Sequence, residues 1–499
     1  MKIVPPFEEF VSLAKGGYTH IPLFCEINGD CTTPVRIYTG IQNDSPYSFL
    51  LESALQSGSS GRYSFISFSP KKIISVRKNV VSIQENGKQY TTTGEPLTVL
   101  RSIIAEYTIP RFQESLPFIG GLVGFISYDA VRLFEQIPDN NPDPLSNDDI
   151  LLLLVENLII YDHYRHTITV STLIQCSGNM RENYDSGCRT IERIVQLIRE
   201  ERGITIPDFP APPNGVCLSI TPNISQSQFE STVNAAIEYI VKGDIFQIVL
   251  SQRFSVPITD VGFNFYRCLR RINPSPYMFY FNINGVVIVG SSPEVLVKCK
   301  DGVVTTRPLA GTSRRGNTPE EDRKIAVELL QNEKERAEHI MLVDLGRNDL
   351  GRICKYGSIS ISEFLEIERY SSVMHIVSEV TGKLANGNDC FDVLRSAFPA
   401  GTVTGAPKIR AMEIIDELET LRRGIYAGAV GYFDFHNNMD TCISIRTVVI
   451  KNNTAYVQTG AGIVADSDPE REYFETIYKS KSLMQALALA EGKTYDFGD

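Results

Sequence analysis

The sequence predicts a sheet-rich α+β fold, and two observations favour this class. Short runs rich in β-branched and aromatic residues recur along the chain, separated by Gly, Asn, Asp and Pro, as expected for strands joined by turns. Segments with apolar residues at helical spacing lie between sets of these runs. Helices and strands therefore share one chain without the regular alternation of a parallel α/β fold.

The N-terminal part of the chain contains mostly strand patterns. A helix is predicted over 188–201, and the following segment, 202–215, contains four prolines that oppose regular structure. We therefore expect a domain boundary between residues 1–215 and 216–499. The strands expected in the first part are 36–40, 62–68, 72–76 and 151–161.

The second part mixes helices with strands. Ser227 and Glu230 form a capping-box pattern ahead of apolar residues at helical spacing, which predicts the start of a helix. Two similar segments, 120–129 and 427–436, indicate either related halves or two Gly-rich buried strands. The strands expected here are 245–256, 277–283, 286–290, 427–435, 442–450 and 455–460.

Composition excludes several classes of protein. The 48 Lys and Arg are outnumbered by 59 Asp and Glu, and no basic block occurs, which argues against nucleic-acid binding and favours a small-molecule or protein partner. The ten cysteines lie far apart without a CxxC pair, as in a reduced cytosolic protein. No signal peptide and no apolar run of about 20 residues is apparent, so we expect a cytoplasmic protein without membrane contact.

Two predicted helices each carry a pair of glutamates three residues apart. The first pattern covers 318–345 and contains Glu335 and Glu338, and a later helix contains Glu472 and Glu475. Residues at this spacing share a helix face. If the two faces met, their carboxylates would suit Mg²⁺, which prefers oxygen ligands. Spacing alone fits a solvated surface equally well.

Other candidate site residues have similarly open interpretations. His375 lies in an alternating stretch that predicts a strand, where a histidine is either structural or catalytic. The loop 401–408 offers backbone N–H groups and two hydroxyls to an anion, but lacks the GK[ST] ending of a phosphate loop. The run 460–462 follows a predicted strand and is either a carboxylate contact or an ordinary turn.

Taken together and in order, these segments resemble the chorismate-utilising enzymes. The resemblance implies two layers of large antiparallel sheets flanked by helices, with the active site in the C-terminal part. The motifs that carry it are SPYSFLLESA, GGLVGFISYD, GDIFQIVLSQRF, NPSPYMFY, SSPEVLVK, RPLAGTSRRG, ERAEHIMLVDLGRNDLGRI, PAGTVTGAPKIRAMEIIDELE and QTGAGIVADSDPEREYFET.

The resemblance also implies roles for individual residues. Glu338 and Glu475 would bind Mg²⁺ directly, while Glu335 and Glu472 would hold its waters. Chorismate would be bound by Gly311, Thr312, Tyr432, Arg446, Gly460, Ala461 and Gly462. The residues implied in catalysis are Glu294, as the acid that protonates the leaving hydroxyl, and His375 with Thr402, for the elimination of pyruvate.

Two positions distinguish the branches of the family. Relatives that add water carry a lysine base where this chain has Gln247, and an amide cannot deprotonate water. Aminodeoxychorismate synthase carries a nucleophilic lysine where this chain has Ala310. We therefore expect amination of chorismate and loss of pyruvate, the anthranilate-forming reaction of tryptophan biosynthesis. The alternatives are aminodeoxychorismate synthase component I and a catalytically inactive sensor.

Partners follow from the same resemblance. No cysteine lies in the G-x-C-x-G turn of a glutaminase, so ammonia would come from a separate glutamine amidotransferase subunit, in a heterotetramer, or from solution. Tryptophan is expected as a feedback inhibitor. Its site would contain Glu52 for the ammonium, Ser53 for the carboxylate, and Pro276, Tyr277 and Met278 for the indole ring.

Overall fold

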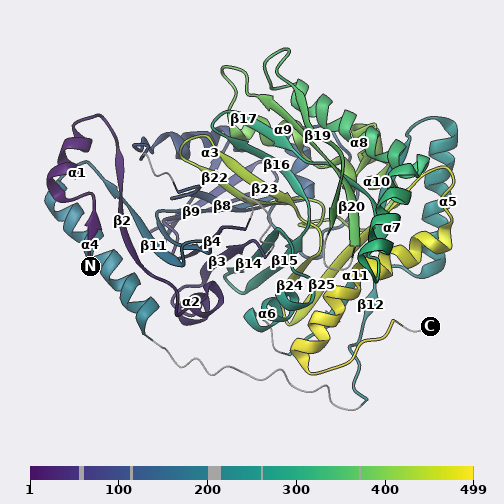
Figure 1. Ribbon diagram of the computed structural model, residues 1–499, viewed down its shortest axis with the longest axis horizontal. Helices are drawn as coiled ribbons and strands as arrows, with labels where there is room; N and C mark the ends of the chain where they lie inside the picture. The colour runs from purple at the N-terminus through teal and green to yellow at the C-terminus, as the bar shows by residue number, and fades with distance from the viewer. Residues whose placement is uncertain (55–60, 113–115, 201–214, 260–261, 370–372, 498–499) are drawn as a thin grey trace.

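Two large antiparallel sheets dominate the molecule, and helices cover their outer faces (Figure 1). The computed structural model describes residues 1–54, 61–112, 116–200, 215–259, 262–369 and 373–497. Within this part of the chain, one sheet has 13 strands and the other 12. The expected α+β class with two layers of antiparallel sheet is confirmed.

The first sheet, sheet A, combines strands from both parts of the chain. Its strands are β1 (Ile3–Val4), β2 (His20–Asn28), β11 (Thr167–Gln175), β10 (Asn157–Asp162), β4 (Tyr63–Phe68), β3 (Tyr47–Glu52), β14 (Tyr277–Ile283), β15 (Val286–Ser292), β24 (Thr447–Lys451), β25 (Thr454–Ile463), β13 (Gln247–Pro257) and β12 (Thr221–Pro222), in spatial order, with β21 (Gly405–Ala406) paired to β13.

The second sheet, sheet B, is built in the same mixed way. Its strands are β18 (Leu309–Arg314), β20 (Val373–Lys383), β17 (Val303–Thr306), β16 (Val295–Lys300), β23 (Met439–Ile443), β22 (Ala429–Asp434), β8 (Gly121–Ile126), β9 (Ile150–Val155), β5 (Lys72–Arg77), β6 (Val80–Glu85) and β7 (Lys88–Thr93), with β19 (Ser360–Arg369) paired to β20.

Helices lie outside the two layers (Figure 1). They are α1 (Phe7–Ala14), α2 (Pro34–Ile41), α3 (Pro96–Ala105), α4 (Met180–Arg199), α5 (Gln226–Lys242), α6 (Phe263–Ile272), α7 (Pro319–Gln331), α8 (Glu333–Gly351), α9 (Cys390–Ala397), α10 (Lys408–Leu418) and α11 (Pro469–Glu491), with 3-10 turns η1 (Tyr128–Leu133) and η2 (Gly401–Val403).

An apolar core fills the space between the sheets. Phe49 and Phe281 of sheet A face this core, and Val123 and Leu153 of sheet B meet them there. Because side chains alternate along a strand, the neighbouring residues face outward to helices. Leu50, for example, belongs to the core beneath the helices on the outer face of sheet A.

Strand pairing joins the two parts of the chain. In sheet A, β3 pairs with β14, and in sheet B, β8 pairs with β22. The similar segments 120–129 and 427–436 therefore contain neighbouring antiparallel strands. The expected boundary segment, 202–215, lies outside the described residues except for Gly215.

Several expected elements need correction. Residues 36–40 belong to helix α2, because Thr33 caps its first turn and Pro34 occupies its first position. Helix α5 begins after Ser225, which forms the capping box with Gln228 in place of Ser227 and Glu230. The single helix expected over 318–345 is two helices, since Asn332 ends α7 and caps α8.

Two expected strands are each divided. The run 151–161 contains β9 of sheet B and β10 of sheet A, so the chain crosses between the layers there. The run 442–450 is interrupted before β24 at Arg446, whose φ is 51°. Among the described residues, no helix is long and apolar enough to span a bilayer.

Candidate active site

Two helix N-termini carry the predicted glutamate pairs. Asn332 caps α8, so Glu335 and Glu338 lie in its first two turns. Asp468 caps α11 and accepts a hydrogen bond from the backbone of Arg471, which places Glu472 and Glu475 in the same position on the second helix. Anionic groups are favoured at helix N-termini by the helix dipole.

The structure brings the four carboxylates into one region. Burial raises the pKa of Glu335, and the charges of Glu338 and Glu475 raise it further. Burial also raises the pKa of Glu472, whose Oε2 atom is buried without a hydrogen-bond partner among the described residues. Glu475 forms an ion pair with Lys479 at 2.6 Å.

These carboxylates suit a hard cation that keeps part of its water shell. Mutual repulsion and the unpartnered Glu472 oxygen both favour added positive charge. In the described part of the chain, no three His, Cys, Asp or Glu side chains are close enough to form a ready ligand cluster.

Gln247 lies beside this carboxylate group. It is the first residue of β13, and its Nε2 donates to Glu338 at 3.3 Å. Strand β25 runs alongside, and a Cβ at Gly462 would lie 2.9 Å from the same nitrogen. Glycine at 462 therefore leaves space for the Gln247 amide next to the metal-binding candidates.

Glu294 is a further buried acid near Lys479. It precedes β16, is only 7% exposed, and burial raises its pKa to about 8, although Thr402 and Lys479 oppose this shift. A cavity of about 40 Å³ lies behind Glu294 and Thr402. The carboxyl group is therefore protonated at neutral pH and has room for about one water beside it.

His375 and Thr312 come from paired strands. β18 and β20 place them opposite each other, and the Thr312 hydroxyl lies 3.0 Å from His375 Nδ1. Burial lowers the pKa of His375, and Arg446 lowers it further. Gly311 has a φ of 73°, and a Cβ there would lie 3.2 Å from the Glu335 carboxylate. The imidazole is therefore neutral and close to the carboxylates.

Arg446 supplies a buried cation. Its Nη1 donates to the carbonyl of Lys479 at 2.5 Å, and burial lowers its pKa while Tyr426 and Glu475 oppose the shift. The Tyr426 hydroxyl would lie 2.7 Å from a Cβ at Gly460. Lys479 Nζ also donates to the carbonyl of Gly460 at 3.0 Å. Arg446, Tyr426 and Lys479 therefore lie close to Gly460 on β25.

The structure does not bring Tyr432 to this site. Tyr432 packs between the sheets, with its ring 4.3 Å from that of Phe118. Tyr426, which precedes β22, is the tyrosine near Arg446. Sequence reasoning missed Tyr426 and Lys479. Lys479 could have been found, because it lies four residues after Glu475 on the same helix.

The residues expected to bind tryptophan do not all face the same side of sheet A. Glu52 accepts hydrogen bonds from Tyr266 at 2.5 Å and Arg270 at 3.0 Å, both on α6. Its carboxylate is thus already neutralised on the outer face of sheet A. Met278, which pairs with Glu52 in the register, is buried on that same outer face.

Tyr277 faces the opposite side, between the sheets. Its hydroxyl donates to Asp440 of β23 at 2.9 Å, and Tyr432 lies near its ring. The hydroxyl of Ser53 is buried without a partner among the described residues. Pro276 is half-buried at the start of β14. Tyr277 therefore faces the space between the sheets, whereas Glu52 and Met278 face the helix-covered side of sheet A.

Known proteins resemble the chain over most of its length. Residues 82–485 match the chorismate binding enzyme family. The anthranilate synthase component 1 of Aquifex aeolicus is 45% identical over 493 residues, which covers 97% of this chain and 98% of that protein. The protein of the same name from Pseudomonas aeruginosa is 44% identical and covers 97% and 99%.

Solved structures agree with these relatives. The crystal structure of anthranilate synthase component I from Streptococcus pneumoniae TIGR4 matches with a TM-score of 0.76 at 38% identity, covering 92% of this chain and 98% of that one. The menaquinone-specific isochorismate synthase of Escherichia coli matches with a TM-score of 0.69 at 18% identity, covering 96% and 98%, which shows the fold alone. The chain belongs to the chorismate binding enzymes and, among them, to the anthranilate synthase component 1 proteins.

Proposed function

We propose that the chain converts chorismate and ammonia to anthranilate, pyruvate and water. The observation that carries the proposal is the buried acid Glu294, whose pKa of about 8 keeps it protonated at neutral pH. Ammonia adds at carbon 2 of the ring while the hydroxyl on carbon 4 leaves, and hydroxide leaves readily only when it is protonated. Glu294 donates that proton, and the product water leaves the ring.

The elimination step needs a base. The aminated intermediate loses the proton on carbon 2 and the enolpyruvyl group, which departs as pyruvate, and the ring becomes aromatic. Neutral His375, with its pKa lowered by burial, is suited to accept a proton. The Thr312 hydroxyl at 3.0 Å from Nδ1 orients the imidazole.

The cationic groups suit the two carboxylates of chorismate. Arg446 is planar and buried, so it suits paired hydrogen bonds to the enolpyruvyl carboxylate. Tyr426 and the backbone of Gly460, Ala461 and Gly462 complete this part of the site. The roles proposed from the family for Gly311 and Thr312 fit their position between His375 and Glu335.

We propose Mg²⁺ as the cofactor of the carboxylate region. Glu338 and Glu475 would hold it directly, and Glu335 and Glu472 would hold its waters. When bound, the ion supplies positive charge to the ring carboxylate. Glu475 would exchange its ion pair with Lys479 for this role. Glu338→Gln should raise the Mg²⁺ concentration needed both for activity and for protection from thermal unfolding.

The alternative reactions fit less well. Aminodeoxychorismate synthase needs a nucleophilic side chain at position 310, where the methyl group of Ala310 is buried. A relative that adds water to chorismate needs a base at position 247, where the Gln247 amide cannot remove a proton from water. A sensor without activity would have no use for a protonated acid buried beside an otherwise complete site.

Product analysis tests the proposal. The chain, incubated with chorismate, Mg²⁺ and an ammonium salt, should produce fluorescent anthranilate and an equal amount of pyruvate. Glutamine should support turnover only after a glutamine amidotransferase subunit is added, since the chain carries no glutaminase motif. Formation of isochorismate or aminodeoxychorismate, or efficient use of glutamine by the single chain, would contradict it.

Tryptophan is the proposed feedback inhibitor, bound between the sheets. Support comes from the unpartnered Ser53 hydroxyl and from Tyr277, which faces the same inter-sheet space as Asp440. Glu52 acts as a positioning residue here, because Arg270 and Tyr266 already hold its carboxylate. The ammonium of tryptophan would then use backbone carbonyl groups or Asp440.

Inhibition assays distinguish this site from the active site. Ser53→Phe should fill the space and abolish inhibition by tryptophan while leaving turnover with ammonium intact. Ser186→Phe, at an exposed position on helix α4, is the size-matched control and should remain inhibited. Equal inhibition of the parent and the Ser53→Phe variant would exclude the proposed site.

A further inference from the structure

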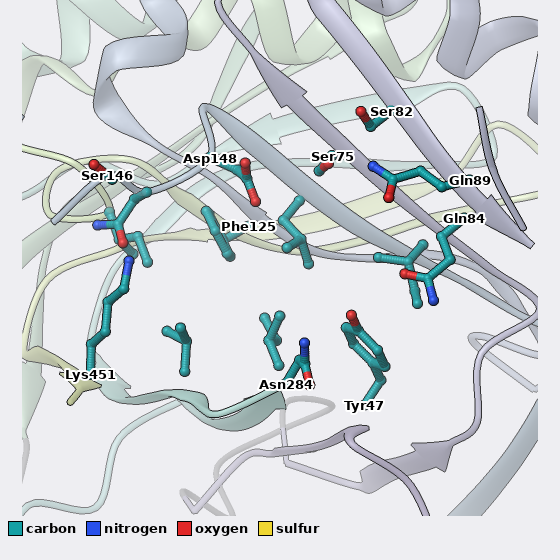
Figure 2. A pocket seen from close by; sticks show the side chains of 16 residues that line it. Tyr47, Ser75, Ser82, Gln84, Gln89, Phe125, Ser146, Asp148, Asn284 and Lys451 are labelled. Atoms are coloured by element: carbon teal, nitrogen blue, oxygen red, sulfur yellow. The ribbon is translucent and has the colours of Figure 1, made fainter. Parts of the chain in front are cut away.

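A second cavity opens between the sheets, well away from the sites described above. Its volume is about 270 Å³, slightly below the roughly 300–1,000 Å³ of pockets for drug-sized ligands. Strands β5, β6, β7 and β8 line it from sheet B, and β3, β24 and the turn between β14 and β15 line it from sheet A. Figure 2 shows their side chains converging on an open space.

Most polar side chains that line this cavity have no hydrogen-bond partner within the described part of the protein. Seven polar side chains from both sheets face the space and form no hydrogen bond or ion pair to another described residue: Tyr47, Ser75, Ser82, Gln84, Gln89, Asp148 and Asn284. The Nδ2 atom of Asn147 is also buried without a partner in this part of the structure. Gln89 and Asn284 are exposed and the other five are partly exposed, so water reaches these groups and a polar ligand could replace it.

Two opposite charges occupy one side of the cavity. Asp148 and Lys451 lie across it from Gln84 and Gln89 (Figure 2). Burial raises the pKa of Asp148, while the charges of Arg77 and, less strongly, Lys451 oppose the shift; Asp148 and Lys451 do not form an ion pair. Lys451 donates one hydrogen bond, to the carbonyl of Leu145 at 2.5 Å, so two of its donors remain. Opposite charges at one end of the cavity suit a molecule that carries both signs.

Apolar side chains line the middle of the cavity. Ile73, Phe125 and Leu151 face it from sheet B, and Ile283 and Val286 face it from sheet A. Leaving such surface in contact with water forgoes about 25 cal/mol for each Å² that a ligand could cover. The wall opposite Asp148 and Lys451 carries the side-chain amides of Gln84 on β6 and Gln89 on β7. The cavity therefore has a charged end, an apolar middle and a hydrogen-bonding end.

We propose that this cavity binds a free α-amino acid with a large side chain. Its ammonium would face Asp148, its carboxylate would face Lys451, and its side chain would lie over Phe125 and Leu151 toward Gln84. A sugar would leave the apolar middle uncovered, a phosphate ester would be repelled by Asp148, and an internal peptide segment lacks the two charges. The inference does not depend on the proposed reaction.

The cavity is separate from the proposed tryptophan site. Tyr277 begins β14 and Ile283 ends it, so about 20 Å of strand lies between the two sites at roughly 3.3 Å per residue. Strand β24 connects the cavity to the active site, because Arg446 directly precedes the strand and Lys451 ends it. A ligand bound here would contact both sheets and hold their spacing. It would also contact β24, the strand that begins next to Arg446 of the substrate site.

Binding measurements with a panel of free amino acids test the proposal. Thermal shift and calorimetry should detect at least one amino acid with a large apolar or aromatic side chain at millimolar concentration. The Ser53→Phe background removes binding at the other inter-sheet site. In that background, Asp148→Asn and Lys451→Met should each weaken binding about tenfold, as expected for the loss of a charged hydrogen bond.

Two controls test whether a loss of binding is specific to the cavity. Lys88→Met removes the same charge from the neighbouring exposed strand β7 and should leave binding unchanged. Unaltered melting temperatures without ligand would show that Asp148→Asn and Lys451→Met fold normally. The proposal is overturned if no amino acid in the panel binds, or if binding is equally strong in both variants. Failure of anthranilate formation would not affect it.

Discussion

Two buried glutamates show how differently the same side chain is used in two regions. Glu294 in the active site is 7% exposed and Glu52 beneath α6 is 5% exposed. Glu52 receives hydrogen bonds from Arg270 and Tyr266, whereas burial dominates at Glu294 and raises its pKa to about 8. Burial alone therefore does not assign a role, and the partners decide between a structural anion and an acid.

The largest expected effect is the loss of the acid. Glu294→Gln keeps the shape but cannot donate a proton, so the rate of anthranilate formation should fall by roughly 10²–10⁴-fold. Steady-state fluorescence with ammonium as the nitrogen source measures it. Glu366→Gln, at an exposed position on β19, is the matched control. A Glu294→Gln variant with near-normal turnover would show that another group protonates the leaving hydroxyl.

The same residue should make stability depend on pH. The folded pKa of Glu294 is raised from 4.5 to about 8, so between these values the folded state retains a proton that the unfolded state has lost. Its contribution to the free energy of unfolding is therefore largest below pH 4.5 and falls as pH rises to about 8.

Glu294→Gln removes this dependence, because the amide does not titrate. Denaturant titrations across this pH range should show that the variant gains stability relative to the parent as pH rises, by a few kcal/mol at most. Catalysis should fall above about pH 8 in the parent, where the acid loses its proton. A constant stability difference between the two proteins across the range would contradict the raised pKa.

A smaller effect is expected at the other glutamate. Arg270→Met leaves the Glu52 carboxylate buried with one hydrogen-bond partner, Tyr266. The free energy of unfolding should therefore fall by about 1–3 kcal/mol, toward the lower end because Arg270 is partly exposed. Turnover with ammonium should persist in the folded variant. Urea unfolding measures the stability, and Arg193→Met, at an exposed position on α4, is the control. A catalytic defect larger than the stability loss would link Glu52 to the active site.

Local sequence signals predicted much of the fold and part of the site. Helices were expected from residue 318 and around Glu472, and both begin where an N-cap is followed by a proline, at Thr318 and Asp468. Most strands were recognised in the same way. The helix at 34–41 was missed because its branched and aromatic residues outweighed an equally local cap at Thr33.

Residues whose position depends on distant contacts were harder to predict. The direction of the Glu52 side chain follows from the register of β3 with β14, which brings α6 over one face of the sheet. Tyr426 lies in a connection next to Ala427, whose φ is 64°, and no strand or helix period marks it. Such placements require knowledge of strands far apart in the sequence.

The smallest effect concerns the two tyrosines near β22. Tyr426 lies near Arg446 and Gly460, whereas Tyr432 stacks on Phe118 between the sheets. Tyr426→Phe should remove one polar contact to the substrate carboxylate and raise KM for chorismate roughly three- to tenfold, equivalent to about 1 kcal/mol. Tyr432→Phe keeps its ring packing and should leave KM unchanged. Initial-rate measurements at saturating ammonium compare the two variants directly. If KM rose only in Tyr432→Phe, Tyr432 and not Tyr426 would contact the substrate carboxylate. The substrate site would then have to extend from Glu294 into the space between the sheets.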